Sequence, residues 1–239
     1  MKLSIVVPCY NEEKNIPFVL ARFREALAGR EEIELLLVNN GSTDSSAAVL
    51  AEHLALADNR FARLVDVPLN QGYGFGILAG LRAARGEYLA WTHADLQTDP
   101  NDVRLGFERL LADEHPQRCF VRGRRIGRPG FDRLFTAGMS LVASSALGAP
   151  LHDINAQPKI FPRSLFESFQ NPPHDFSLDL YALYQAHKAG LKVLEQPVHF
   201  GGRQHGVAKG GASLKGKVRL TRRTLSYILR LKRELAEAA

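Results

Sequence analysis

Three polar side chains follow directly after an apolar segment of the sequence. Residues 88–92 have the composition of a buried strand, and His93, Asp95 and Gln97 come within the next five residues. A strand that is buried in a parallel sheet seldom ends in an imidazole, a carboxylate and an amide together, because most strand ends are simple solvated turns. The cluster therefore indicates that this strand end binds something polar.

Two other predicted strands end in similar polar sequences. Segment 8–12 follows the apolar run 3–7, and segment 39–44 follows the apolar run 33–38. In an open parallel sheet, ligands bind at the carboxyl ends of the strands. One polar loop alone would be interpreted as a solvated turn, but three at the same edge of one sheet predict a binding site.

Predicted strands and helices alternate along the chain. Strands are expected at residues 3–7, 33–38, 61–67, 88–92, 118–122, 158–161 and 193–198. Helices are expected at 15–27, 42–56, 74–84, 99–111, 131–147, 178–188 and 214–235, with Ser42 or Thr43 as the cap of the second. This repetition predicts an α/β fold, a Rossmann-like and mostly parallel sheet that is flanked by helices on both faces.

The length and composition fit one large domain with an appendage. The chain has 239 residues, of which 45% are hydrophobic and 23% are charged, as in a globular protein with a sizeable core. Its two cysteines, Cys9 and Cys119, form neither a metal-binding nor a disulfide pattern. We expect a main domain at residues 1–212 and a C-terminal segment at 213–239.

The excess positive charge lies in the C-terminal segment. Residues 213–239 hold eight Lys or Arg and two Glu, which leaves 23 basic and 23 acidic residues in the main domain. A neutral main domain argues against a nucleic-acid-binding protein. Apolar side chains between Leu214 and Leu235 fall largely on one helical face, which predicts a basic amphipathic helix. Such a helix either contacts an anionic membrane surface or packs on its own domain or in a dimer, with its basic face in water.

The sequence shows no clear membrane span and no signal peptide. The apolar run 3–7 is too short for a signal sequence, and the uncharged segment 134–151 is interrupted by Ser, Thr, Gly and Pro. We therefore expect a cytoplasmic protein, with peripheral attachment to the inner face of the membrane as an option. The oligomeric state is left open.

Seven motifs resemble those of glycosyltransferase family 2, the group of GT-A fold enzymes that includes polyprenyl-phosphate mannose and glucose synthases. They are IVVPCYNE (5–12), VNNGSTD (38–44), NQGYG (70–74), HADLQTDP (93–100), GRR (123–125), DINAQPKIF (153–161) and RQHGVAK (203–209). They occur in the family's order and cover nearly the whole main domain. The resemblance implies a GT-A fold and an inverting glycosyltransferase that uses a nucleotide-diphosphate sugar and Mg²⁺ or Mn²⁺.

The resemblance assigns the first two polar loops to the nucleotide. Pro8, Tyr10 and Glu12 would line the pocket for the base and the ribose, where a ring can stack and a carboxylate can accept from hydroxyls. The family usually has two acidic residues before the glycine of the second motif, whereas both are amides here, Asn39 and Asn40. We expect Asn40 to contact the nucleotide. An amide both donates and accepts, so the base stays open.

The Asp-x-Asp motif of the family falls on His93-Ala94-Asp95. We expect Asp95 and Gln97 to hold the cation, because Mg²⁺ and Mn²⁺ prefer hard oxygen ligands, and His93 and Ala94 to lie beside the nucleotide sugar. His93 could ligate Mn²⁺, contact a phosphate when protonated, or support Asp95. Asp99 is predicted to cap the following helix.

The later motifs supply the remaining candidates. Arg125 and Arg203 match family positions near the diphosphate or the acceptor phosphate, and Lys209 ends the same motif as Arg203. We expect all three to contact the nucleotide sugar, and the two arginines to be catalytic. Asp153 is expected to face the acceptor, as general base if the acceptor is a sugar hydroxyl, whereas an ionised phosphate needs no base. Asp179 is a further carboxylate of interest, for which a catalytic role is set against that of a solvated or capping residue.

The reaction that the resemblance implies is sugar transfer to a polyprenyl phosphate or to another envelope lipid or glycan acceptor. The substitutions at Asn39, Asn40 and His93 leave a non-catalytic sugar-nucleotide-binding protein as an alternative, which would bind its ligand without turnover. A nucleotidyltransferase is a further alternative on a similar sheet, although the Gly-rich basic signature expected at its first strand end is missing.

Overall fold

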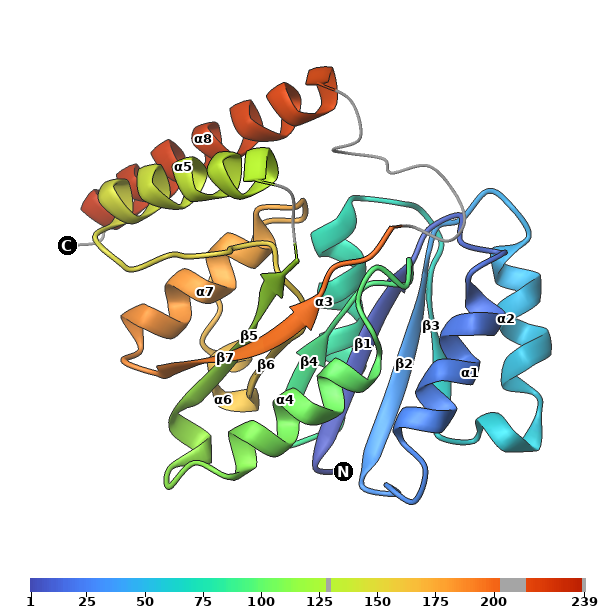
Figure 1. The fold of residues 1–239 in the computed structure, drawn as a ribbon. Helices are drawn as coiled ribbons and strands as arrows, with labels where there is room; N and C mark the ends of the chain where they lie inside the picture. Colours follow the sequence, from blue (N-terminus) through green and yellow to red (C-terminus); the bar gives the residue numbers. More distant parts are fainter. Residues whose placement is uncertain (128–129, 203–213, 238–239) are drawn as a thin grey trace.

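One mixed sheet runs through the centre of the protein, with helices on both faces (Figure 1). The computed structural model describes residues 1–127, 130–202 and 214–237. Within them, seven strands form the sheet in the order β3-β2-β1-β4-β6-β5-β7. They are β1 Leu3–Cys9, β2 Ile33–Asn40, β3 Ala62–Val67, β4 Tyr88–Trp91, β5 Cys119–Ile126, β6 Lys159–Pro162 and β7 Lys192–His199. Strand β6 runs antiparallel to β4 and β5, and the other neighbouring strands are parallel.

The helices divide between the two faces of the sheet. Residues of α1, α2 and α4 join one buried cluster, and residues of α3, α5, α7 and α8 join the other. The bounds are α1 Ile16–Ala26, α2 Ser46–Leu54, α3 Tyr73–Ala83, α4 Asn101–Leu111, α5 Gly130–Leu147, α6 Arg163–Glu167, α7 Leu178–Lys188 and α8 Leu214–Glu237, with 3₁₀ turns at Ala57–Asn59 and Pro116–Arg118. The predicted α/β architecture is therefore confirmed.

Alternate side chains of the central strands enter the two different cores. In β1, Ile5 and Val7 cluster with residues of α1 and α4, whereas Val6 clusters with residues of α3 on the opposite face. Because both faces of the sheet are covered, these strands are continuous runs of apolar residues and do not alternate between apolar and polar residues. Each fully buried Ile, Leu or Val contributes about 1.5–3 kcal/mol through its removal from water.

The C-terminal helix packs against the rest of the chain. Figure 1 shows α8 beside α5, and the buried side chains Tyr227, Ile228 and Leu231 of α8 belong to the same core cluster as Trp91 of β4. The predicted helix is thus present. Its packing corresponds to the alternative in which the helix lies on its own domain. Its exposed side chains include Arg222, Arg223, Arg230, Lys232 and Arg233. The predicted boundary between residues 212 and 213 lies outside the described residues.

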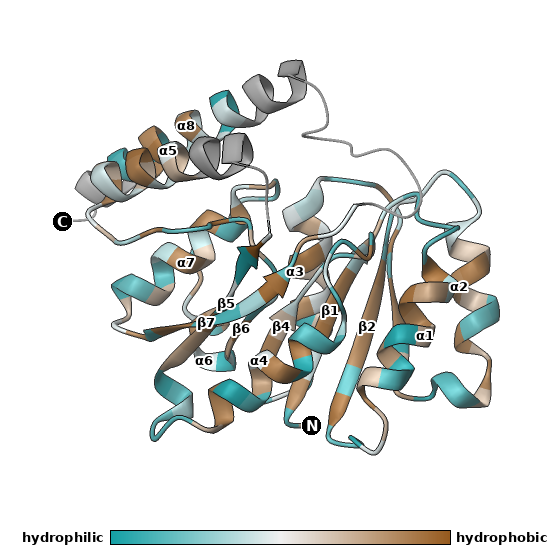
Figure 2. Cartoon of the chain, in the orientation of Figure 1, coloured by the Kyte–Doolittle hydropathy of each residue, from teal (hydrophilic) through white to brown (hydrophobic). Residues whose placement is uncertain are grey.

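The uncharged segment 134–151 forms most of α5 and the turn after it. Ala143 is buried in the core, whereas Leu141 and Val142 are 71% and 45% exposed. Figure 2 shows that both α5 and α8 carry hydrophobic residues among more polar ones. Among the described residues, no helix is both long and apolar enough to cross a membrane.

Helix α2 begins later than the sequence predicts. It starts at Ser46 with Ser45 at its cap, so the prediction that Ser42 or Thr43 caps it is wrong. These residues bind the loop after β1 instead: the backbone N–H of Thr43 donates to Asn11 Oδ1 at 2.8 Å, and the N–H of Asn11 donates to Ser42 Oγ at 3.2 Å. Contacts between the two loops therefore take the place of the expected first helical turn.

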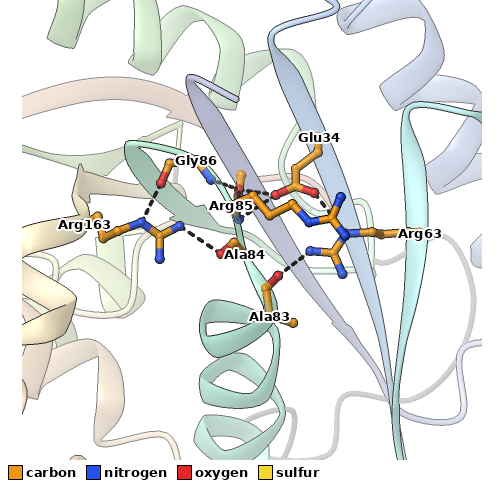
Figure 3. A network of polar contacts seen from close by, with 8 residues as sticks. Glu34, Arg63, Ala83, Ala84, Arg85, Gly86 and Arg163 are labelled. Carbon is orange, nitrogen blue, oxygen red and sulfur yellow. Dashed lines mark hydrogen bonds and ion pairs between the residues drawn. The ribbon is translucent and has the colours of Figure 1, made fainter.

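A buried carboxylate ties the strands together at the edge of the sheet that is remote from the polar loops (Figure 3). Glu34 Oε1 accepts from Ser4 Oγ at 2.6 Å and from the backbone N–H of Arg85 at 2.7 Å, and Glu34 Oε2 accepts from Arg63 Nε at 2.9 Å. Arg163 donates to the carbonyls of Ala84 and Gly86 in the same turn. Burial alone would raise the pKa of Glu34, but the bonds from Ser4, Arg63 and Arg85 outweigh it and lower the pKa below 4.5.

We expect Glu34→Gln to lower the free energy of unfolding by about 2 kcal/mol at pH 7, because hydrogen bonds to a charged acceptor are lost. The folded-state pKa of Glu34 is depressed, so its contribution is present above the ordinary pKa and disappears as pH falls through the folded value. Urea unfolding of the variant and the wild type at pH 7 and pH 3 measures both effects. Glu31→Gln, at an exposed neighbouring position, is the matched control and should change little.

Candidate functional site

The three predicted polar loops begin side by side at one edge of the sheet. Strand β1 lies between β2 and β4, with Cys9 opposite Asn39 and Val6 opposite Trp91. The parallel direction of these strands brings their carboxyl ends to the same edge (Figure 1). This is the edge at which open α/β sheets bind ligands.

The loops after β1 and β2 are locked to each other. The side chain of Asn11 donates to Thr43 Oγ1 at 3.1 Å, and the backbone N–H of Glu12 donates to Ser46 Oγ at 2.9 Å. Asn11 has a left-handed backbone with φ of 55°, which asparagine tolerates better than most residues. The predicted nucleotide-binding residues Tyr10 and Glu12 lie in this loop, Pro8 lies near the end of β1, and all three are half-buried.

The two amides at the end of β2 have specific partners. Asn39 donates from its side-chain nitrogen to Asp66 Oδ1 at 2.7 Å, where an aspartate would set two carboxylates against each other. Asn40 is 2% exposed and donates to the carbonyl of Gly72 at 3.0 Å. A Cβ at Gly76 would lie 2.7 Å from the Asn40 side chain, so the amide packs closely under α3. Asn40 thus holds the start of α3, and its predicted contact with a nucleotide stays a prediction.

Asp95 and Gln97 share one tight turn after β4. Leu96 between them has a left-handed backbone with φ of 54°, a conformation that costs a branched side chain about 1–2 kcal/mol. The backbone N–H of Gln97 donates to Asp95 Oδ1 at 3.2 Å. The Gln97 side chain donates from Nε2 to the carbonyl of Gly201 at 3.1 Å, which leaves Oε1 as its acceptor atom. Strained backbone of this kind is frequent at binding sites.

The donors of this turn fit a hard divalent cation. A carboxylate from Asp95 and an amide oxygen from Gln97 are the ligand types that Mg²⁺ and Mn²⁺ prefer, and such sites usually add waters and substrate phosphates. In the described part of the chain, no group of three or more His, Cys, Asp or Glu lies close enough together to hold a metal. Asp99 in the same loop accepts the N–H of Asn101 at 2.9 Å and pairs with Arg22. Helix α4 begins at Asn101 with Pro100 at its cap position, so the prediction that Asp99 caps this helix is wrong.

His93 is held by the first residue of α3. Its Nε2 lies 3.0 Å from the hydroxyl of Tyr73, and the two rings meet edge to face with centroids 5.7 Å apart. The opposite side of the Tyr73 ring stacks on Phe176 at 4.7 Å. Ala94 is buried between His93 and Asp95. His93 is therefore a positioned side chain and not a freely rotating surface residue.

Arg125 and Asp153 form a largely buried ion pair at the end of β5. Asp153 accepts from the backbone N–H of Arg125 at 2.8 Å and from its Nε at 2.8 Å, with a further contact from Nη2. The guanidinium also lies over the ring of Phe200 at 5.6 Å. Burial alone would raise the pKa of Asp153, but its bonds to Arg125 and the charge of that arginine lower it below the ordinary value. A carboxylate with a lowered pKa is a weak general base.

Comparison with known proteins identifies the family of this chain. The family model of Glycosyl transferase family 2 matches residues 4–196. The chain belongs to Glycosyl transferase family 2. It is 30% identical over 172 residues to undecaprenyl-phosphate 4-deoxy-4-formamido-L-arabinose transferase of Proteus mirabilis. This alignment covers 70% of this chain and 51% of that protein. It is also 27% identical to dodecaprenyl-phosphate galacturonate synthase of Rhizobium johnstonii. This alignment of 242 residues covers 97% of this chain and 68% of that protein. The chain thus spans about half the length of the first relative and two thirds of the second.

A solved structure shares the fold of this member of family 2. It is glucosyl-3-phosphoglycerate synthase of Mycobacterium tuberculosis in complex with Mn²⁺, UDP-glucose and phosphoglyceric acid. The TM-score is 0.72 at 22% sequence identity, over 97% of this chain and 79% of the other. The predicted GT-A fold is confirmed by this likeness together with the order of the strands.

One buried cation of the glycosyltransferase domain was not predicted as part of the site. Lys159, at the start of β6, has no exposed surface, and its Nζ donates to the carbonyls of Ile154 and Ala156 at 2.8 and 2.5 Å. Burial lowers the pKa of Lys159 to about 8. These bonds fix the loop that begins with Asp153, whose φ of 43° is also left-handed. The motif DINAQPKIF contains Lys159, but a lysine in a predicted strand gave no sign that it would be buried.

Asp179 also has a place that the sequence did not indicate. It is 2% exposed and its Oδ1 accepts from Trp91 Nε1 at 3.1 Å and from Gln157 Nε2 at 2.8 Å. The interpretation of Asp179 as a solvated or capping residue is therefore wrong. Gln157 itself is held by close packing, because a Cβ at Gly123 would lie 2.0 Å from the Gln157 carbonyl oxygen. Of this cluster only Gln157 belongs to a quoted motif, DINAQPKIF, which meets the GRR motif at Gly123.

Two predicted binding residues lie outside the described residues. Arg203 and Lys209 belong to segment 203–213, and their roles stay predictions from the family motif. The described chain before this segment ends at Gly202, and the N–H of the preceding Gly201 donates to the Gln97 carbonyl at 2.8 Å. The described part of the chain thus leads toward this motif from the Asp95 turn.

Proposed function

We propose that this protein is an inverting, metal-dependent glycosyltransferase that moves a sugar from a nucleotide-diphosphate sugar to a polyprenyl phosphate or another envelope lipid or glycan acceptor. The observation that carries the proposal is the turn after β4, in which Asp95 and the oriented amide of Gln97 stand at the binding edge of a family 2 domain. The names of two relatives, both polyprenyl-phosphate sugar enzymes, support a lipid-phosphate acceptor.

Each candidate residue has a distinct task in this proposal. Asp95 and Gln97 would hold Mg²⁺ or Mn²⁺, and a protein of the same fold was crystallised with Mn²⁺ and UDP-glucose. When bound, such an ion neutralises charge that develops on a departing diphosphate. Pro8, Tyr10 and Glu12 would surround the nucleoside from the end of β1 and the loop after it.

The Arg125–Asp153 pair favours an ionised phosphate as the acceptor. Asp153 is already bound by three groups of Arg125, and its lowered pKa makes it a poor acceptor for a proton from a sugar hydroxyl. A phosphate monoester needs no general base, because its oxygen is already a nucleophile. Arg125 would then serve to attract an anionic substrate, with Asp153 fixing its guanidinium. The attack would invert the anomeric carbon in a single in-line displacement.

The proposal includes contact with an anionic membrane surface. The exposed cations of α8 listed above surround Leu229, which is 59% exposed, and Leu141 and Val142 of the adjacent α5 are exposed as well. Basic and apolar side chains on neighbouring helices suit the interface of an anionic bilayer, and a lipid-linked acceptor would lie in that bilayer.

The direct test is a transfer assay with undecaprenyl phosphate in lipid vesicles and a panel of UDP- and GDP-sugars. We expect one donor to give a lipid-linked sugar of inverted anomeric configuration, and EDTA to reduce the rate by at least about 10³-fold, because the ion stabilises the leaving group by several kcal/mol. Vesicles that contain phosphatidylglycerol should support faster transfer than neutral ones. Undecaprenol, which lacks the phosphate, is the matched acceptor control and should not react.

Other outcomes would select the alternatives. Release of pyrophosphate from a nucleoside triphosphate would indicate a nucleotidyltransferase. Metal-dependent binding of a nucleotide sugar without turnover, with every acceptor class tested, would indicate a non-catalytic binding protein. Either result would contradict the proposed reaction.

A further inference from the structure

A chain of polar side chains leads from His93 into the core of the protein. His93 Nε2 lies 3.0 Å from the Tyr73 hydroxyl, and that oxygen lies 3.4 Å from Gln157 Nε2. Gln157 Nε2 lies 2.8 Å from Asp179 Oδ1, which also receives Trp91 Nε1–H. The chain joins α3, the loop before β6, α7 and the end of β4. None of the catalytic or binding roles discussed above accounts for it.

The direction of the hydrogen bonds in this chain follows from its buried end. The indole N–H of Trp91 can only donate, and a carboxylate can only accept, so Asp179 Oδ1 is an acceptor. The Gln157 atom beside it must therefore be the amide nitrogen. In the described part of the chain, the oxygen of that amide is buried without a hydrogen-bond partner. The amide thus directs both N–H groups into the chain, one to Asp179 and one to Tyr73.

The hydroxyl of Tyr73 transmits this direction to His93. Its oxygen accepts from Gln157, so its single proton is available for His93 Nε2. Burial, together with the charges of Asp179 and Asp95, raises the pKa of Tyr73 well above 10, so the phenol keeps that proton. A nitrogen that accepts a hydrogen bond carries no proton in neutral imidazole. When the Tyr73 hydroxyl donates to Nε2, the proton of neutral His93 is on Nδ1, the less common tautomer of a free histidine side chain.

We propose that Asp179, Gln157 and Tyr73 position His93 as a hydrogen-bond donor through Nδ1 for a diphosphate oxygen, and not as a ligand of the metal. A nitrogen that carries a proton has no lone pair for a cation, and Nε2 is already engaged by Tyr73. Among the side chains that the structure describes, Nδ1 of His93 has no hydrogen-bond partner. This inference rests on the proposed function for the identity of the ligand, whereas the tautomer does not depend on it.

The position of His93 suits this role. It stands two residues before Asp95, at the place where the family motif has its first acid, and an acid there would add negative charge next to a diphosphate. A neutral imidazole with its proton on Nδ1 adds a donor instead. Tyr73, Gln157 and Asp179 are positioning residues in this scheme, because each acts on the ligand only through His93.

The decisive experiment is the long-range ¹⁵N–¹H correlation spectrum of histidine side chains in the ligand-free full chain, at a pH where the ring is neutral. The signals of His93 are assigned by their loss in His93→Gln. We expect the Nδ1–H tautomer for His93 in the wild type and a shift toward Nε2–H in Tyr73→Phe, which keeps the ring that stacks on Phe176. Tyr181→Phe is the matched control, because it removes a hydroxyl that bonds Gln170 in the same core and should leave His93 unchanged. An Nε2–H tautomer in the wild type would overturn the proposal.

Binding measurements test the second half of the inference. Mn²⁺ alone, followed by water-proton relaxation, should bind His93→Ala as it binds the wild type, whereas Asp95→Asn should lose this binding. UDP and GDP, titrated by calorimetry, should include one nucleotide whose affinity falls about tenfold in His93→Ala and in Tyr73→Phe, because a hydrogen bond to a charged oxygen is lost. In the same two variants, the affinity for the monophosphate of that nucleoside, UMP or GMP, should fall less than the affinity for the diphosphate.

The outcomes separate this inference from the proposed function. Loss of Mn²⁺ binding in His93→Ala as large as that in Asp95→Asn would show that His93 is a ligand and would overturn the inference alone. Absence of any Mn²⁺ or nucleotide binding by the folded wild type would overturn the proposed function, and with it the ligand that we assign to His93. The tautomer spectrum would still decide whether the relay from Asp179 exists.

Discussion

Asp95→Asn should reduce sugar transfer by about 10³-fold, which corresponds to about 4 kcal/mol of lost stabilisation. The substitution removes the carboxylate charge of the turn after β4 but keeps an oxygen that can accept the N–H of Gln97. The strained backbone at Leu96 should therefore stay in place, and the loss should report the missing negative charge. Steady-state kinetics with the active donor, together with calorimetric titration of nucleotide with and without Mn²⁺, measure the effect.

Asp99→Asn is the matched control for this variant. Asp99 lies in the same loop, its side chain is 44% exposed, and it pairs with Arg22. An asparagine can still accept the N–H of Asn101, and an exposed ion pair is worth at most about 1 kcal/mol. We expect a change in kcat/KM of less than about fivefold. Metal-dependent transfer that survives in Asp95→Asn but fails in Asp99→Asn would place the cation elsewhere in the loop.

The strands could be predicted from the sequence because the sheet is covered on both faces. Residues such as Ile5, Val6 and Val7 enter two different cores, so each central strand is a continuous apolar run that needs no knowledge of its neighbours. The order of the strands in the sheet, by contrast, cannot be predicted from the local sequence. Strand β6 enters antiparallel between β4 and β5, and that placement depends on contacts with segments about 70 and about 40 residues away in the chain. The five-residue helix α6 is too short to show a helical period.

The residues of the candidate site also differ in whether the sequence alone reveals them. His93, Asp95 and Gln97 stand out because polar side chains directly follow a buried strand, a feature of one short segment. Tyr73, Gln157 and Asp179 do not stand out, because their meaning arises only when three distant elements meet. Asp179 in particular lies in the first turn of α7, where an acidic residue is ordinary on a solvated helix. Its burial is compensated by Trp91 and Gln157, which no local pattern reveals.

Asp153→Asn should lower the free energy of unfolding by about 3 kcal/mol at pH 7, because it leaves the largely buried guanidinium of Arg125 without its counter-ion. Asparagine tolerates the left-handed backbone that residue 153 adopts, so the loss of charge is separated from backbone strain. The folded-state pKa of Asp153 is depressed below 3.8, so the difference between variant and wild type should be complete at pH 7 and should vanish as pH falls through the folded value. Urea unfolding at pH 7 and at pH 3 measures it.

Two further variants distinguish a buried pair from an ordinary surface contact. Glu87→Gln breaks the exposed Lys2–Glu87 pair and should cost less than about 1 kcal/mol. The double variant Arg125→Met with Asp153→Asn removes both members of the buried pair, and we expect it to be more stable than Asp153→Asn alone, because no uncompensated charge remains. If Asp153→Asn were as stable as the wild type, the guanidinium of Arg125 would have to be hydrated or paired with another anion in solution. In that case Asp153 would be free to face the acceptor and could act as a general base.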